Sequence, residues 1–84
     1  MKSNLDISDQ RILELIDILK QNDIIKFSQT FCDAVNVPKQ LIRNIRIGNQ
    51  HFTVHHIEAI CKIYNVNANW IMGLEKNMFR KSGK

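Results

Sequence analysis

The hydrophobic residues of the chain recur at helical spacing in several separate stretches. The first stretch, from about Ser8 to Gln21, predicts a helix with an apolar stripe of Ile12, Leu15, Ile16 and Leu19. Ser8 or Asp6 is suited to cap this helix, and Asp9 falls in its first turn, where a carboxylate suits the helix dipole. Residues 1–7 lack most of this pattern, and we expect them to form a flexible arm.

Residues 27–48 predict two short helices joined by a tight turn. One apolar face of each helix is expected to pack on a common core. The face of the first helix holds Phe27, Phe31, Cys32 and Val35, and that of the second holds Leu41, Ile42 and Ile45. Asn36 tolerates the left-handed backbone of a tight turn, and Pro38 suits the first turn of the second helix. Gly48 suits a left-handed cap at the end of that helix. This pattern is typical of a helix-turn-helix.

A fourth helix is expected after a polar loop. Thr53 is suited to cap it, and the helical pattern ends near Asn65. Its predicted core stripe holds Val54, Ile57, Cys61 and Tyr64, with Ile60 on the flank.

The last predicted helix, from Asn69 to Leu74, docks on the core through Trp70, Ile71 and Leu74. From Glu75 onward we expect a basic, frayed tail, although Met78 and Phe79 are apolar enough to pack. The predicted fold is therefore all-α: a compact five-helix domain over residues 8–75, followed by a basic tail over 76–84.

The outer face of the second short helix is polar and carries no acid. Its residues are Lys39, Gln40, Arg43, Asn44 and Arg46, all able to donate hydrogen bonds. The net charge of the chain is +4, and all of its eight acids except Glu58 and Glu75 lie at or before Asp33. Positive charge is therefore concentrated on this helix and the following loop, which favours a polyanion such as DNA in the major groove.

The composition argues against membrane, secreted and metal-binding proteins. With 84 residues the chain is sized for one domain, and no apolar run is long enough to cross a membrane. The N-terminus lacks the apolar run of a secretory signal, so we expect a cytoplasmic protein.

Cys32 and Cys61 are not spaced for a zinc site. His51 and His55 have the spacing of a metal pair, but no third ligand lies nearby in the sequence, so we expect no metal, no cofactor and no enzymatic activity.

Two segments, DAVNVPKQLIRNIRIG and YNVNANWIMG, resemble the lambda-repressor-like DNA-binding domains of phage Cro and repressor proteins and of bacterial xenobiotic-response-element regulators. The resemblance covers roughly Asp9 to Leu74. It implies the helix-turn-helix fold, sequence-specific binding of double-stranded DNA and a recognition helix from Pro38 to Ile47.

The resemblance also implies roles for individual residues. The positions that meet base edges hold Lys39, Gln40, Arg43 and Asn44. The positions that grip the phosphate backbone hold Ser28, Gln29, Arg46, Asn49, Gln50 and His51. Some positions depart from the family pattern: Ser28 replaces a usual glutamine, Cys32 an alanine and Asn36 a glycine. Leu41 and Ile47 replace usual polar residues, and Leu41 is expected either to touch a thymine methyl group or to pack inward.

Two functional hypotheses follow. The first is a small transcriptional regulator, a repressor, that acts as a homodimer on an inverted-repeat operator. Its candidate dimer surface holds Trp70, Ile71, Met72 and Leu74, with Met78 and Phe79 behind them; alternatively, Trp70 simply closes the core. The second is a protein-interaction module, such as the antitoxin of a toxin–antitoxin pair, which would bind its protein partner through the same apolar end.

Overall fold

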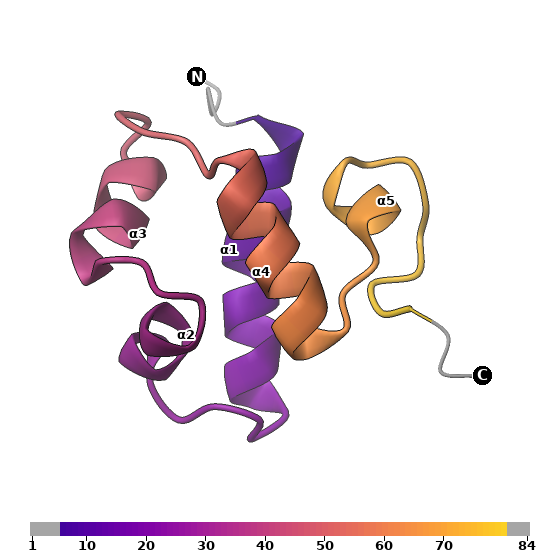
Figure 1. Ribbon diagram of the computed structural model, residues 1–84, viewed down its shortest axis with the longest axis horizontal. Helices are drawn as coiled ribbons and strands as arrows, with labels where there is room; N and C mark the ends of the chain where they lie inside the picture. The colour runs from indigo at the N-terminus through magenta and orange to yellow at the C-terminus, as the bar shows by residue number, and fades with distance from the viewer. Residues whose placement is uncertain (1–5, 81–84) are drawn as a thin grey trace.

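The computed structural model describes residues 6–80, which form five helices and no strand (Figure 1). In chain order these are α1 (Ile7–Gln21), α2 (Ser28–Ala34), α3 (Lys39–Arg46), α4 (Val54–Tyr64) and α5 (Ala68–Ile71). In Figure 1, α1 runs through the middle behind α4, α2 and α3 lie on one side, and α5 lies on the other with the C-terminal segment. The predicted all-α class is confirmed. No helix among residues 6–80 combines the length and apolarity needed to cross a bilayer.

The core is built around α1, whose predicted stripe is confirmed. Its four aliphatic residues have no exposed surface: Ile12, Leu15, Ile16 and Leu19. Each of the other helices contributes at least one residue that is equally buried: Phe31, Ile45, Ile60 and Ile71. Phe31 of α2 stacks on Tyr64 of α4, with ring centroids 5.6 Å apart. All five helices therefore bury apolar surface on one core, which is the main stabilising term of such a domain.

Residues in the left-handed region turn the chain where the sequence suggested. Asn36 has φ 59° between α2 and α3, and Gly48 has φ 85° after α3. Pro38, however, is the N-cap residue of α3 with φ −74° and ψ 146°, and does not lie in its first turn. Its extended conformation leaves the Pro38 carbonyl free to accept a hydrogen bond from the Leu41 N–H at 3.0 Å.

Three predicted core positions are wrong, and each lies at the edge of a helical pattern. Phe27 is 67% exposed because it precedes α2 in an extended conformation, where helical spacing does not apply. Val54 is 77% exposed: the centre of the buried face of α4 is Ile60, and Val54 lies about a third of a turn away around the helix. Leu74 is 74% exposed because α5 ends at Ile71, before Leu74 is reached.

The start of α1 also differs from expectation. The helix begins at Ile7, and Asp6 is its N-cap residue but makes no side-chain capping bond. Ser8 lies inside the helix. Residues 1–5 of the expected arm are outside the described part of the chain. Thr53, by contrast, caps α4 as predicted, in a reciprocal capping box with His56.

The C-terminal segment is held against the domain as far as Arg80, contrary to the expected fraying. The Asn67 N–H donates to the Met78 carbonyl at 2.8 Å, and the Arg80 N–H donates to the Asn65 carbonyl at 2.9 Å. An isolated antiparallel bridge pairs Val66 with Phe79, and Met78 packs half-buried on the core. These contacts order the segment because backbone pairing and apolar burial act together on it. Residues 81–84 lie outside the described range.

Candidate nucleic-acid interface

Helix α3 has one buried and one exposed face. Leu41 and Ile42 are each 6% exposed and Ile45 is fully buried. Leu41 therefore packs inward, which decides between its two predicted roles. The exposed face carries Lys39, Gln40, Arg43 and Arg46. Because the apolar face is buried in the core, the polar face is fixed outward on a rigid support.

The turn between α2 and α3 holds the two helices together. The Val37 N–H donates to the Cys32 carbonyl at 2.9 Å across the turn. Cys32 has no exposed surface, and burial raises the pKa of its thiol, so Cys32 remains a neutral, small apolar residue between the two helices. Together with the buried face of α3, this contact sets the orientation of the exposed face.

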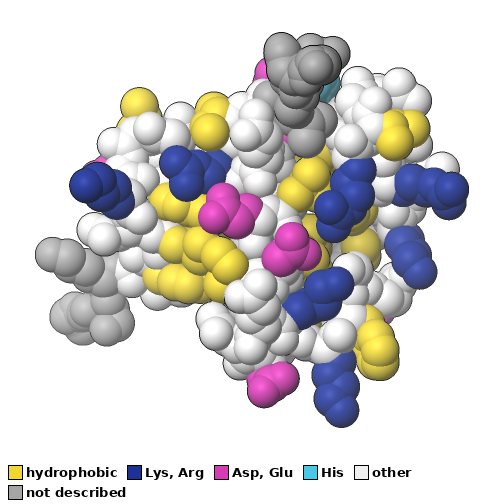
Figure 2. Space-filling model, turned by 180° about the vertical axis from the view of Figure 1, so that it is seen from behind, with side chains coloured by type: hydrophobic (Ala, Val, Ile, Leu, Met, Phe, Trp, Pro, Cys, Tyr) yellow, Lys and Arg dark blue, Asp and Glu magenta, His cyan; other side chains and the backbone are white. Residues whose placement is uncertain are grey.

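A hollow of about 260 Å³ lies between α2 and α3. Its floor holds Cys32 and Ile42, and its rim holds Ser28, Lys39, Arg43 and Arg46. Figure 2, which views the molecule from behind, shows most of the visible Lys and Arg side chains over the half of the molecule that holds α2 and α3. Three cationic side chains around one concave surface produce a local field that attracts an anion such as a phosphate group.

Several of the predicted contact residues already have partners within the chain. Asn44 is half-buried, and its amide donates to Gln50 Oε1 at 2.6 Å, which joins α3 to the following loop. The Gln29 amide donates to Asp33 Oδ1 at 2.8 Å, and Ser28 accepts a bond from Lys20 Nζ at 3.3 Å. Asn49 is exposed in the loop after α3. The exposed donors for which no partner is found within residues 6–80 are Lys39, Gln40, Arg43 and Arg46 of α3 and Asn49 of the loop. Gln29, Asn44 and Gln50 must exchange partners or use their second polar atom to meet DNA.

Asp9 lies in the first turn of α1, as predicted, and it also has a second task. It is fully buried, and its Oδ1 accepts a bond from the Phe52 N–H at 3.0 Å. Its Oδ2 lies 2.6 Å from Nδ1 of His51, and Asp6 Oδ2 lies 3.5 Å from the same nitrogen. Asp9 therefore anchors the loop between α3 and α4 to α1.

The acids beside His51 change its charge. The hydrogen bond from the ring to the Asp9 carboxylate, with the charges of Asp9 and Asp6, raises the pKa of His51 although burial opposes this. The raised pKa favours the protonated form of His51, whose partly exposed ring lies at the end of the surface that was predicted to grip phosphate. Sequence reasoning missed this contact because the two acids lie more than 40 residues before His51.

The same three residues satisfy the distance requirement of a metal site. Ligand atoms of Asp6, Asp9 and His51 all lie within 4.8 Å of one another. The sequence showed no third ligand near His51, but the fold brings two acids, Asp6 and Asp9, close to it. However, both Asp9 oxygens already accept hydrogen bonds, and the raised pKa of His51 favours an imidazolium ion, which cannot bind a metal. An ion pair accounts for this arrangement without a metal.

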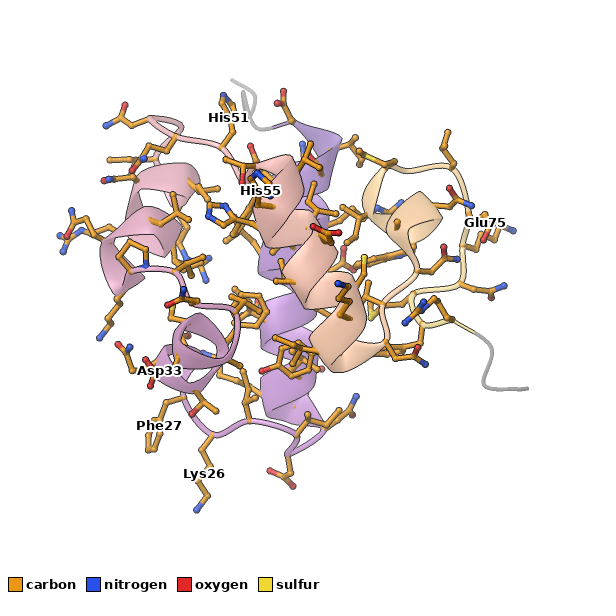
Figure 3. The ribbon with its side chains drawn as sticks, in the orientation of Figure 1. Lys26, Phe27, Asp33, His51, His55 and Glu75 are labelled. Carbon is orange, nitrogen blue, oxygen red and sulfur yellow. The ribbon has the colours of Figure 1, made fainter. Side chains whose placement is uncertain are left out.

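The other two histidines do not complete a metal site with His51. His56 belongs to the capping box: its Nδ1 accepts a bond from the Thr53 N–H at 3.1 Å. Burial, with the nearby charge of His55, lowers the pKa of His56 and keeps that nitrogen free to accept. His55 is exposed on α4 (Figure 3).

Comparison with known proteins identifies no relative: no protein-family model, no curated protein and no solved structure matches the chain. The functional assignment of this surface therefore depends on the geometry and chemistry of its own residues.

Proposed function

We propose that this chain is a sequence-specific double-stranded DNA-binding protein, a small transcriptional regulator that places α3 and its flanking residues, 38–47, in the major groove. One observation carries the proposal: α3 buries Leu41, Ile42 and Ile45 while exposing four long donor side chains. The lambda-repressor-like pattern of the sequence supports the same docking geometry.

Base contacts are assigned to Lys39, Gln40 and Arg43, which lie together on the exposed face. Lys and Arg donate to guanine acceptors, and Gln forms a paired contact with adenine. Asn44 joins them if its bond to Gln50 opens. Arg46 and Ser28 border the α2–α3 hollow and are assigned to phosphate. Gln29 of α2 and the loop residues Asn49 and Gln50 are assigned to phosphate as well. His51 lies beside them and is assigned to phosphate as well, a contact that its protonated form would favour.

A single domain of this size contacts few base pairs. We therefore propose that it acts as a homodimer on an inverted-repeat operator, with half-sites about 34 Å apart, as helix-turn-helix dimers do. Repression by occupancy of the operator is the simplest outcome of such binding, and it needs no further domain.

The test is selection of bound duplexes from a random library at physiological salt, followed by sequencing. We expect an enriched inverted repeat whose binding weakens steeply with salt, because each neutralised phosphate releases counterions. Lys39→Ala should weaken binding to the selected duplex by about 1–3 kcal/mol and relax the preference at one base position. Lys76→Ala is the matched control, because Lys76 is also exposed but lies in the segment after α5. Unchanged binding by Lys39→Ala, or no enrichment of any sequence, would contradict the proposal.

A second candidate function is a protein-interaction module such as an antitoxin. The observation that favours it is the exposure of Ile24 and Phe27, 54% and 67%, in the connection between α1 and α2. Phe27 points away from the body of the domain in Figure 3. Large apolar side chains exposed within one short connection are a feature of contact surfaces when they form a continuous patch. A stable, salt-insensitive protein complex that is lost in Phe27→Ser would support this alternative.

A further inference from the structure

The outer face of α4 is concave and partly apolar. A groove of about 400 Å³ runs along it toward α5, and its apolar lining comes from Val54, Ile57, Cys61 and Ala68. Val54 is 77% exposed at the N-terminal end of α4, so its side chain is available to a partner at that end of the groove. In Figure 1 this helix faces the viewer, and no other described element lies in front of it.

The C-terminal segment builds one wall of this groove. Arg80 lines the groove, and its Nε donates to Asn65 Oδ1 at 3.0 Å. A second guanidinium nitrogen of Arg80 lies 3.4 Å from the Cys61 carbonyl, near the end of α4. The groove is thus a built feature of the domain, with a wall fixed by hydrogen bonds to α4.

Two opposite charges lie on the same outer face. Glu58 and Lys62 are one turn apart, both are exposed, and both line the groove. Within residues 6–80 the ion pairs found are those of His51, so neither Glu58 nor Lys62 has an ion-pair partner there. A face that carries one acid and one base, one turn apart, is complementary to a second copy of itself turned around.

We propose that a second copy of this chain covers the groove, with the two α4 helices packed antiparallel around a two-fold axis at the level of Ile60. This register sets Glu58 of each copy opposite Lys62 of the other, and so forms two ion pairs. It also brings Val54 of each copy to the C-terminal end of the other copy's α4, where Cys61, Ala68 and Arg80 line the groove. Trp70 and Ile71 of the predicted dimer surface are buried in the core, so Trp70 closes the core as the alternative had it. Met72, Leu74 and Phe79 of that surface remain exposed, but they do not line the groove.

The arrangement also suits the proposed function, on which this part of the inference rests. In Figure 1, a half-turn about a horizontal axis in front of α4 inverts α4, as antiparallel packing requires. The same rotation leaves α3 on its original side of the molecule. Both α3 helices would then face one DNA duplex.

The test is the oligomeric state of the full chain, measured by sedimentation equilibrium over a range of concentrations. Glu58→Lys and Lys62→Glu should each weaken the dimer, on the order of tenfold or more in Kd, because like charges then face each other twice. The double variant Glu58→Lys/Lys62→Glu should restore it. A mixture of the two single variants should form heterodimers, because one copy then offers two bases and the other two acids.

Lys26→Glu and Asp17→Lys are the charge-matched controls, since both residues are exposed outside the groove, and circular dichroism checks that each variant folds. A wild-type chain that stays monomeric, a dimer that ignores both reversals, or single variants that fail to associate when mixed would each overturn the inference. Monomers that still select a duplex would refute the dimer but leave the proposed DNA binding intact. A dimer that selects no duplex would support the α4 interface but refute the proposed DNA binding.

Discussion

The buried carboxylate of Asp9 accepts hydrogen bonds from His51 Nδ1 at 2.6 Å and from the Phe52 N–H at 3.0 Å. These two bonds tie the first turn of α1 to the loop that follows α3. Phe52 is itself 7% exposed, so its N–H has little access to water. The position of the loop beside the proposed DNA-binding surface therefore depends on Asp9, an acid near the N-terminus.

Replacing Asp9 should destabilise the fold. We expect Asp9→Ala to lower the free energy of unfolding by about 2–3 kcal/mol, because it leaves the Phe52 N–H unpaired in a buried position. Urea denaturation followed by circular dichroism measures this loss. Asp17→Ala on the exposed face of the same helix is the control and should change stability by less than about 0.5 kcal/mol. Equal effects of the two substitutions would show that the Asp9 bonds contribute nothing specific.

The pH dependence of stability should carry a signature of His51. Its pKa is raised above the ordinary value of 6.5 by the hydrogen bond to Asp9, so the folded state binds this proton more tightly than the unfolded state. The resulting stabilisation is fully present below pH 6.5 and is lost as the pH rises through the folded pKa. The difference in stability between wild type and His51→Gln should therefore shrink from pH 6.5 upward. A difference that stays constant with pH would contradict the ion pair.

Base and phosphate contacts should differ in their response to mutation. Once an operator is selected, Arg43→Ala should cost about 1–3 kcal/mol and relax specificity at one base position. Arg46→Ala should instead weaken binding to all sequences alike and reduce the slope of log K against log salt by about 1. Fluorescence anisotropy titrations at several salt concentrations separate the two. If both variants changed only the salt slope, α3 would contact the backbone without discriminating bases.

The contribution of the buried face of α3 to stability can be compared with that of Ile47, the exposed residue that follows the helix. Ile42→Ala should lower the free energy of unfolding by about 2–5 kcal/mol, because the Ile42 side chain is only 6% exposed and its removal leaves a cavity in the core. Ile47→Ala removes the same atoms from a residue that is 65% exposed and should cost little. Thermal unfolding of the two variants side by side gives the comparison. A large loss for Ile47→Ala would indicate that this side chain is covered in solution, for example by a partner protein.

Local sequence determined most of the secondary structure. The aliphatic stripe of α1, the capping box at Thr53, the left-handed Asn36 and Gly48, and the buried Ile45 all follow from chemistry within a few residues. The polar face of α3 was visible for the same reason: when one face of a helix is apolar at regular spacing, the residues between must point outward.

Only the tertiary structure decided the rest. Phe27 and Leu74 are exposed because they lie just outside the helices, at boundaries that depend on where neighbouring elements begin and end. Val54 is exposed because it lies about a third of a turn from the buried centre of α4. The bonds of Asp9 to the loop, and those of Arg80 to the end of α4, join residues that periodicity cannot relate. Both depend on the path of the intervening chain around the core. Periodicity describes how each segment folds by itself, whereas long-range contacts arise only when all five segments bury their apolar faces together.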